Sequence, residues 1–217
     1  MKIGFLGTGH ITSSVIQGIF KSNLRINKIY VSPRNKSISK KLSKKFKKVS
    51  IAKNNQELIN LTNWVFLAVT PKVAHKILKT LIFKKNQKII SFISTINIEK
   101  LKKYTKAKKV TRVIPLPFIG INKGPIIICP NDKTIKNFFN KLGKTIEIRN
   151  EKVSKNFWTT SSFMAPFYHF MEITSNWLVK KGVKRNAAED YTRELFSALT
   201  QDSIYKNKLS LKQLVSE

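Results

Sequence analysis

The sequence contains few of the features that would place the protein in an oxidising or membrane environment. It has one cysteine, Cys129, so no disulfide framework can form within the chain, and the apolar run GPIIICP around it indicates a core residue rather than a nucleophile. No apolar run reaches the roughly 18 residues that span a bilayer. The apolar start of the chain breaks at Gly7, which excludes a secretory signal. These absences predict a cytoplasmic protein with no membrane partner.

Acidic residues are also scarce, since 42 Lys and Arg stand against 11 Asp and Glu, a formal net charge of +31. Such an excess attracts anions and is compatible with nucleic-acid binding through counterion release. The lysines, however, are spread over segments such as 36–48 and 99–109, on what we expect to be solvated helix faces. Lys, Ile and Asn are enriched together, as in proteins of A/T-rich genomes. We therefore predict no specific nucleic-acid partner, and keep a basic nucleic-acid-binding module as an alternative.

What the sequence does contain is a regular alternation of strand-like and helix-like segments through residue 150. Apolar, β-rich runs predict strands at 2–7, 28–33, 49–52, 64–69, 88–94, 110–115, 124–130 and 144–150. Helical periodicity predicts helices at 11–22, 37–46, 55–61, 73–83, 97–105 and 134–142. This order is typical of an α/β fold, a Rossmann-type doubly wound and mostly parallel sheet. We expect residues 1–150 to form a dinucleotide-binding domain.

The composition changes near residue 150, and no β-rich run follows Ile148. Two helices are expected at 161–182 and 186–205. The first is apolar over much of its circumference and carries eight large apolar side chains: Phe163, Met164, Phe167, Phe170, Met171, Ile173, Trp177 and Leu178. Two helices cannot bury so many among themselves. We expect residues 151–217 to form a small helical dimerisation domain, giving a homodimer or higher homo-oligomer.

The most specific motif follows the first strand, where GTGHIT at 7–12 fits the pattern G-x-G-x-x-G with Thr12 in the third position. The first glycine permits a tight turn into a helix, and the second lets a pyrophosphate approach the backbone. The helix N-terminus then supplies amide donors and a positive dipole end. The predicted cofactor-binding residues of this turn are Gly7, Thr8, Gly9, His10 and Ile11. A partly exposed packing role for His10 remains an alternative.

The end of the second strand indicates which dinucleotide binds. Enzymes that prefer NAD usually carry an acidic residue there, about 20 residues past the glycines, but KIYVSPRN has none. Ser32 and Arg34 can instead hold a 2′-phosphate through a hydroxyl and a guanidinium, with Asn35 and Lys36 beside them. We therefore predict NADP(H) over NAD(H). The alternative is that Arg34 is one more surface cation.

Taken together, these segments resemble the pyrroline-5-carboxylate reductases. The resembling segments are KIGFLGTGHITSSVIQGI, VSPRN, VFLAVTPK, IISFISTINIEKL, RVIPLPFIGINKG and, in the helical part, FMEI and KKGV. The resemblance implies that Ala68, Val69, Thr70 and Pro71 border the cofactor, as the A-V-K-P-Q loop of the family does. It also implies NADPH-dependent hydride transfer to the imine of 1-pyrroline-5-carboxylate, which gives L-proline in proline biosynthesis. The resemblance further implies that the reaction needs no metal and that the protein is a dimer whose helical domains interleave.

The sequence departs from the family where the substrate is expected. The family's P-N-T-P is here Pro115–Phe118, its G-S-G-P-A loop is Phe163–Phe167, and the threonine of its A-Q-T segment is Leu195. The sequence ends at LKQLVSE, where the family continues into V-T-S-P-G-G-T-T. Nearby polar groups could build a different site: Thr159, Thr160, Ser161, Ser162, Tyr168 and His169. We assign no catalytic residue. Reduction of another imine, or a catalytically inactive NADP-binding homologue with a sensor or assembly role, remains open.

Overall fold

A computed structural model describes residues 1–216, which form two compact units. The first runs from Met1 to Thr159, and the second begins at Thr160. Each unit is described by itself. Among the described residues, no helix has the length and apolar character that crossing a bilayer would require.

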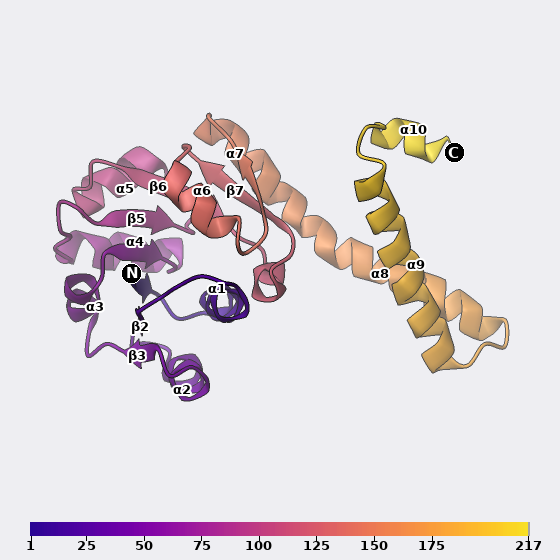
Figure 1. Ribbon diagram of the computed structural model, residues 1–217, viewed down its shortest axis with the longest axis horizontal. Coiled ribbons are helices and arrows are strands. Elements are labelled where there is room, and N and C mark those ends of the chain that lie inside the picture. The colour runs from indigo at the N-terminus through magenta and orange to yellow at the C-terminus, as the bar shows by residue number, and fades with distance from the viewer. Residues whose placement is uncertain (217) are drawn as a thin grey trace. The chain divides into compact units, whose positions relative to one another are not determined.

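The first unit is built on one eight-stranded sheet (Figure 1). Its strands are β1 (Lys2–Leu6), β2 (Lys28–Val31), β3 (Val49–Ile51), β4 (Trp64–Leu67), β5 (Lys88–Ser91), β6 (Val110–Ile114), β7 (Pro125–Cys129) and β8 (Lys144–Glu147). Their order is β3-β2-β1-β4-β5-β6-β7-β8, and every neighbouring pair is parallel except β6 with β7. The predicted Rossmann-type, mostly parallel sheet is confirmed.

Helices cover both faces of this sheet, as the continuous apolar strands require. They are α1 (His10–Lys21), α2 (Lys36–Lys45), α3 (Asn55–Leu61), α4 (Pro71–Ile77), α5 (Ile98–Thr105), α6 (Lys133–Phe139) and α7 (Glu151–Thr159), with 3-10 turns η1 (Leu78–Thr80) and η2 (Pro117–Ile121). Apolar side chains of α1, α2 and α6 pack on one face, and those of α3, α4 and α5 pack on the other. Each of these six helices thus buries apolar side chains against the strands, whereas the buried residue of α7 is Ser154.

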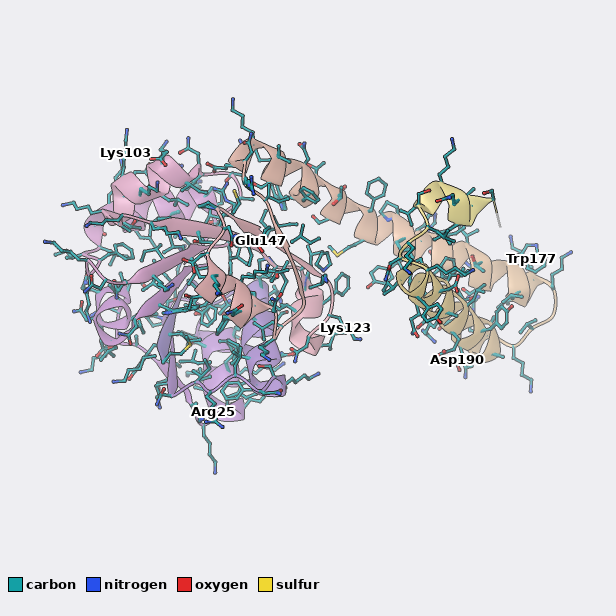
Figure 2. The ribbon with its side chains drawn as sticks, turned by 45° about the horizontal axis from the view of Figure 1, so that its top comes forward. Arg25, Lys103, Lys123, Glu147, Trp177 and Asp190 are labelled. Carbon is teal, nitrogen blue, oxygen red and sulfur yellow. The ribbon has the colours of Figure 1, made fainter. Side chains whose placement is uncertain are left out.

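The core follows the alternation of side chains along each strand. On the face that α1 and α6 cover, Phe5 of β1 stacks on Phe66 of β4, with ring centroids 4.6 Å apart. On the opposite face, Leu6 and Leu67 pack with Ala74 of α4. All of these side chains are fully buried. Apart from Arg112, which is buried, the described lysines and arginines lie outside this core, and Figure 2 shows Arg25, Lys103 and Lys123 extending from the surface.

Several predicted elements are shorter than expected, and a tertiary contact explains the shortening of one of them, the helix expected at 73–83. Strand β4 ends at Leu67 rather than residue 69. The helix expected at 73–83 ends at Ile77 and is followed by the single turn η1. Beyond it, Ile82 exchanges two hydrogen bonds of 2.9 Å with the side-chain amide of Gln56 on α3. The side-chain amide of Gln56 therefore satisfies the N–H and the carbonyl of Ile82, which a longer helix would have satisfied with its own backbone groups. The sequence patterns also gave no sign of η2 or α7.

The second unit is helical, consisting of η3 (Thr160–Phe163), α8 (Met164–Lys180), α9 (Arg185–Tyr205) and α10 (Leu211–Val215). Helices α8 and α9 pack through an aromatic cluster in which Phe167 and Phe170 both meet Phe196 edge-on, at centroid distances of 5.6 and 5.5 Å. Many large apolar side chains elsewhere in this unit are exposed, and Trp177 is 58% exposed (Figure 2). The two predicted helices are therefore present, and α10 is additional.

Candidate functional site

The turn between β1 and α1 has the geometry that the glycine pattern predicts. Gly7 has φ of +109°, and a Cβ built on it would lie 2.3 Å from the carbonyl oxygen of Ala68. Only glycine fits there, because the backbone is in the left-handed region and the loop after β4 crosses close by. Thr12, which stands where a third glycine was expected, is buried and donates its hydroxyl to the Gly7 carbonyl at 2.8 Å. It closes the turn from the helix side.

Ser32 ties this turn to the end of β2. Its hydroxyl oxygen accepts the backbone N–H of Gly7 at 3.1 Å, and its carbonyl accepts the hydroxyl of Thr8 at 2.8 Å. The side chain of Ser32 is buried, whereas Arg34 and Lys36 nearby are exposed. In this geometry Ser32 orients the glycine turn, and the exposed side chains of Arg34 and Lys36 are accessible to a ligand.

These segments enclose a cavity of about 480 Å³ at the carboxyl ends of β1, β2 and β4. Seven of the predicted cofactor-binding residues line it: Gly7, Thr8, Gly9, Ser32, Arg34, Val69 and Thr70. Four others do not: His10, Ile11, Ala68 and Pro71. Of these, His10 is exposed and borders a separate, smaller cavity beside Lys41 of α2. Pro71 is the first residue of α4, and Thr70 precedes it.

The cavity also includes residues that the sequence patterns did not single out. Asn55 comes from the start of α3, and Val73 and Ile77 from α4. Asn35 and Lys36, mentioned above only as neighbours of Arg34, line it as well. Asn54 caps α3 by accepting the N–H of Glu57 at 2.8 Å, so a capping pattern marks this helix start in the sequence. That α3 begins next to the glycine turn follows only from the strand order.

The residues present fit a phosphorylated dinucleotide. A Cβ built on Gly9 would have no heavy atom within 4 Å, so packing within the protein does not require a glycine here and the turn keeps open space. The first N–H groups of a helix have no partner within the helix, and they face a ligand at its N-terminus. Arg34 and Lys36 add positive charge, and no carboxylate appears among the described residues that line the cavity.

The positions where the sequence departs from the resembling family lie in both units. Leu116 is half-buried and precedes η2 in the first unit. Met164 begins α8, and Leu195 lies on α9, both half-buried. On α8, His169 is exposed with its Nδ1 3.1 Å from a carboxylate oxygen of Glu172. The structure therefore shows His169 paired at the surface, not packed in a core, and it assigns no catalytic group.

The chemistry of the remaining reactive groups is limited. Cys129 is 1% exposed, as predicted for a core residue. Burial raises the pKa of its thiol, and the nearby carboxylate of Glu151 raises it further, while Arg112 acts in the opposite direction. A thiol with a raised pKa is a poor nucleophile. Within residues 1–216, no three His, Cys, Asp or Glu side chains gather closely enough to hold a metal ion.

Comparison with known proteins bears on the predicted resemblance. The family described as NADP oxidoreductase, coenzyme F420-dependent, matches residues 2–98. The pyrroline-5-carboxylate reductase of Staphylococcus epidermidis is 24% identical over 232 aligned residues, which cover 99% of this chain and 83% of that protein. The predicted resemblance to the pyrroline-5-carboxylate reductases is confirmed.

Solved structures of pyrroline-5-carboxylate reductases share the fold. That of Streptococcus pyogenes has a TM-score of 0.81 and 23% identity, covering 100% of this chain and 84% of its own. The pyrroline carboxylate reductase of Plasmodium falciparum, solved with NADP bound, has a TM-score of 0.80 and 22% identity, covering 99% and 82%. At this identity the likeness shows the fold. Together with the family match, it supports an NADP-dependent oxidoreductase.

Proposed function

We propose that the protein binds NADP(H) in the cavity beside the glycine turn and reduces the carbon–nitrogen double bond of a small imine. The first candidate substrate is 1-pyrroline-5-carboxylate, whose reduction gives L-proline in cytoplasmic proline biosynthesis. The observation that carries the proposal is the open space at Gly9 with Arg34 and Lys36 at the rim of the same cavity. The resemblance to the pyrroline-5-carboxylate reductases supplies the reaction class.

In this proposal each part of the cavity has a defined task. The N–H groups at the start of α1 bind the pyrophosphate, and Gly7 and Ser32 hold those groups in place. Arg34 and Lys36 bind the 2′-phosphate, which is why we expect NADP(H) to be preferred over NAD(H). Val73 and Ile77 form an apolar wall. When bound, the reduced nicotinamide supplies a hydride to the imine carbon.

The proposal is tested by binding and turnover measured in sequence. NADPH and NADH are titrated against the fluorescence of the three tryptophans, and 1-pyrroline-5-carboxylate is then added while the absorbance of the reduced nicotinamide is followed. We expect tighter binding of NADPH and its oxidation by the imine. Equal affinities for both cofactors would contradict the assigned role of Arg34, and failure of both cofactors to bind would contradict the cofactor site itself.

A second candidate is a reductase of a different imine, one without a carboxylate group. It is favoured by Phe163–Phe167, an apolar segment where the family has small and hydroxyl-bearing residues, and by Leu116 in place of an amide. In the same assay it predicts NADPH oxidation with an apolar cyclic imine and none with 1-pyrroline-5-carboxylate. NADPH binding without turnover on any imine would instead favour a non-catalytic sensor or assembly role.

We further propose that the protein forms a homodimer through its helical unit. In that unit, the buried residues among those described are Ser175, Ala188 and Thr192, none of which is a large apolar side chain. Exposed apolar groups are numerous, including Phe163, Phe170, Ile173, Trp177, Tyr191, Leu199 and Ile204. Exposed apolar surface of this extent marks an interface. Sedimentation at micromolar concentration should give the mass of two chains.

A further inference from the structure

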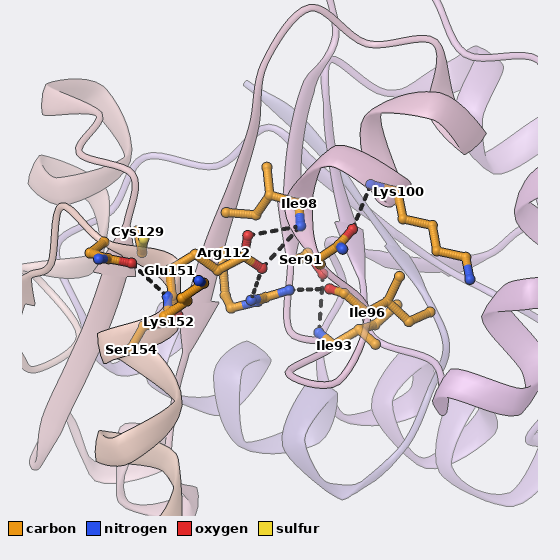
Figure 3. A network of polar contacts seen from close by, with 12 residues as sticks. Ser91, Ile93, Ile96, Ile98, Lys100, Arg112, Cys129, Glu151, Lys152 and Ser154 are labelled. Carbon is orange, nitrogen blue, oxygen red and sulfur yellow. Dashed lines mark hydrogen bonds and ion pairs between the residues drawn. The ribbon is translucent and has the colours of Figure 1, made fainter.

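An ion pair between the buried guanidinium of Arg112 and the partly exposed carboxylate of Glu151 lies in the first unit, outside the proposed cofactor cavity. Arg112 of β6 is 1% exposed, which makes it the largest fully buried side chain. One of its terminal nitrogens, Nη1, donates to the carboxylate of Glu151, and the other, Nη2, donates to the carbonyl of Ile96 (Figure 3). A charge is tolerated in a protein interior only when it is paired and hydrogen-bonded. Arg112 therefore depends on these two partners.

Glu151 in turn holds the backbone next to the carbonyl that Arg112 binds. Both of its carboxylate oxygens accept the N–H of Ile98, at 3.0 and 3.2 Å (Figure 3). Glu151 is the first residue of α7, while Ile96 and Ile98 flank the start of α5. The segment 92–97 connects β5 to α5, and the pair holds its C-terminal end. Arg112 binds the carbonyl of Ile96 within the segment, and Glu151 binds the N–H of Ile98, the first residue of α5.

The position of this segment relates it to the cofactor. The strand order β3-β2-β1-β4-β5-β6 has the two halves of a dinucleotide-binding sheet, and a dinucleotide binds across the crevice outside the carboxyl ends of both halves. The half with β1, β2 and β3 carries the glycine turn and Arg34, the expected place of the adenosine phosphates. The segment 92–97 follows the carboxyl end of β5 in the other half. It therefore lies where the nicotinamide is expected.

We propose that Arg112 and Glu151 are positioning residues that hold segment 92–97 in the conformation that receives the nicotinamide half of the cofactor. They act through Ile96 and Ile98 and do not touch the cofactor themselves. The inference rests on the proposed NADP(H) function, but it concerns a different part of the sheet from the phosphate-binding cavity. The effects of replacing Arg112 and Glu151 can therefore be distinguished from a loss of binding at the phosphate-binding cavity.

The decisive variant removes the anchoring groups without leaving a buried charge. In Arg112→Met with Glu151→Met, two apolar side chains of similar length replace the pair, an exchange that proteins often tolerate. The carbonyl of Ile96 and the N–H of Ile98 then lose their partners. The matched control is Glu99→Gln, one residue beyond Ile98, where an exposed carboxylate pairs with Lys102 on the same helix. If the double variant does not fold by circular dichroism, Glu151→Gln keeps the side-chain volume and is expected to show the same changes to a smaller extent.

Two ligands separate the two halves of the cofactor. The first, 2′,5′-ADP, has the phosphorylated adenosine half and lacks the nicotinamide. We expect the double variant to bind it as the unmodified protein does, while NADPH binds about tenfold more weakly. We also expect the emission of the reduced nicotinamide to rise on binding to the unmodified protein and to lose that rise in the double variant. The control should match the unmodified protein with both ligands. Unchanged NADPH affinity and emission in the double variant would overturn the proposal.

Amide hydrogen exchange tests the anchoring without any ligand. We expect exchange in segment 92–97 to become faster in the double variant, and exchange in the glycine turn to stay the same. Unchanged exchange in 92–97 would overturn the proposal even if NADPH binding were weakened. If the unmodified protein bound neither 2′,5′-ADP nor NADPH, the proposed function would fail, and the role of the pair toward the nicotinamide would fail with it. If it bound 2′,5′-ADP but gave no change in nicotinamide emission, only the inference would fail.

Discussion

The two units of the chain differ in how they bury their apolar side chains. The first packs apolar groups on both faces of its sheet, and Phe5, Leu6, Phe66 and Leu67 are fully buried within one chain. The second presents its aromatic and aliphatic groups at the surface, with Tyr205 87% exposed. A sheet covered by helices on two sides forms a complete core from one chain. A pair of helices does not, because each covers only one stripe of the other.

This difference indicates that the two units contribute to function in different ways. The first contains the cavity in which we propose that NADP(H) binds, together with the strands that shape it, so cofactor binding is expected to follow from one chain. The second carries the segment Phe163–Phe167, where the sequence departs from the family's substrate loop, on a unit whose folding we expect to depend on association. The predictions below test this division, beginning with the variant of largest expected effect.

The strongest test introduces charge into the exposed apolar surface of the helical unit. Ile173 and Trp177 lie one helical turn apart on α8 and are 52% and 58% exposed. If a second copy covers them, Ile173→Glu with Trp177→Glu should weaken the dimer about a thousandfold, or about 4 kcal/mol. Sedimentation equilibrium measures this. The control, Lys103→Glu at an exposed position of α5 in the first unit, makes the same change in net charge and should leave the dimer intact. An unchanged dimer in the double variant would show that this surface is not the interface.

The second test concerns the two glycines of the turn in the first unit. Gly7→Ala places a Cβ 2.3 Å from a backbone oxygen at φ of +109°, so we expect a loss of about 3 kcal/mol in the free energy of unfolding. Gly9→Ala meets no protein atom within 4 Å, so stability should stay nearly constant while NADPH affinity falls about tenfold. Urea unfolding and fluorescence titration measure the two quantities. Equal loss of stability in both variants would mean that Gly9 has a packing role.

The contrast between these glycines shows what sequence patterns can and cannot predict. The motif at 7–12 identified the turn, because a tight strand-to-helix connection requires glycine at defined spacing. It could not identify Asn55, which reaches the same cavity from α3 only because β3 pairs with β2 at the edge of the sheet. The length of α4 was misjudged for a similar reason, since the backbone of Ile82 pairs with Gln56 through tertiary hydrogen bonds. Local periodicity contains no information on such partners.

A third variant tests whether cofactor preference resides in the first unit alone. Arg34→Ala removes the guanidinium at the rim of the cavity while leaving Ser32 and its hydrogen bond to Gly7 in place. We expect the affinity for NADPH to fall about tenfold and that for NADH to change little. Lys45→Ala, at an exposed position at the other end of α2, is the control for loss of one positive charge. If both affinities fall equally, Arg34 supports the fold of the loop and does not select the phosphate.

The smallest expected effect concerns the acid stability of the first unit. Burial acts to raise the pKa of Asp132, but the N–H of Ile135 and the ammonium groups of Lys109 and Lys88 outweigh it and hold the pKa below its ordinary value of 3.8. Because the folded state binds the proton less well, the carboxylate stabilises the fold above about pH 4, and that contribution is lost as the pH falls through the lowered pKa. Stability should therefore decline with acidification in this window.

Asp132→Asn isolates this contribution, because asparagine also caps α6 through the N–H groups of Thr134 and Ile135. What the variant loses is attraction to Lys88 and Lys109, whose side chains are 36% and 55% exposed. Solvent screening limits such pairs, so we expect a loss of less than about 1 kcal/mol at pH 7. At a pH below the lowered pKa, the variant and the unmodified protein should have the same free energy of unfolding. Urea unfolding at pH 7 and at that acidic pH would measure this. A difference that persisted in acid would assign the role of Asp132 to helix capping and not to its charge.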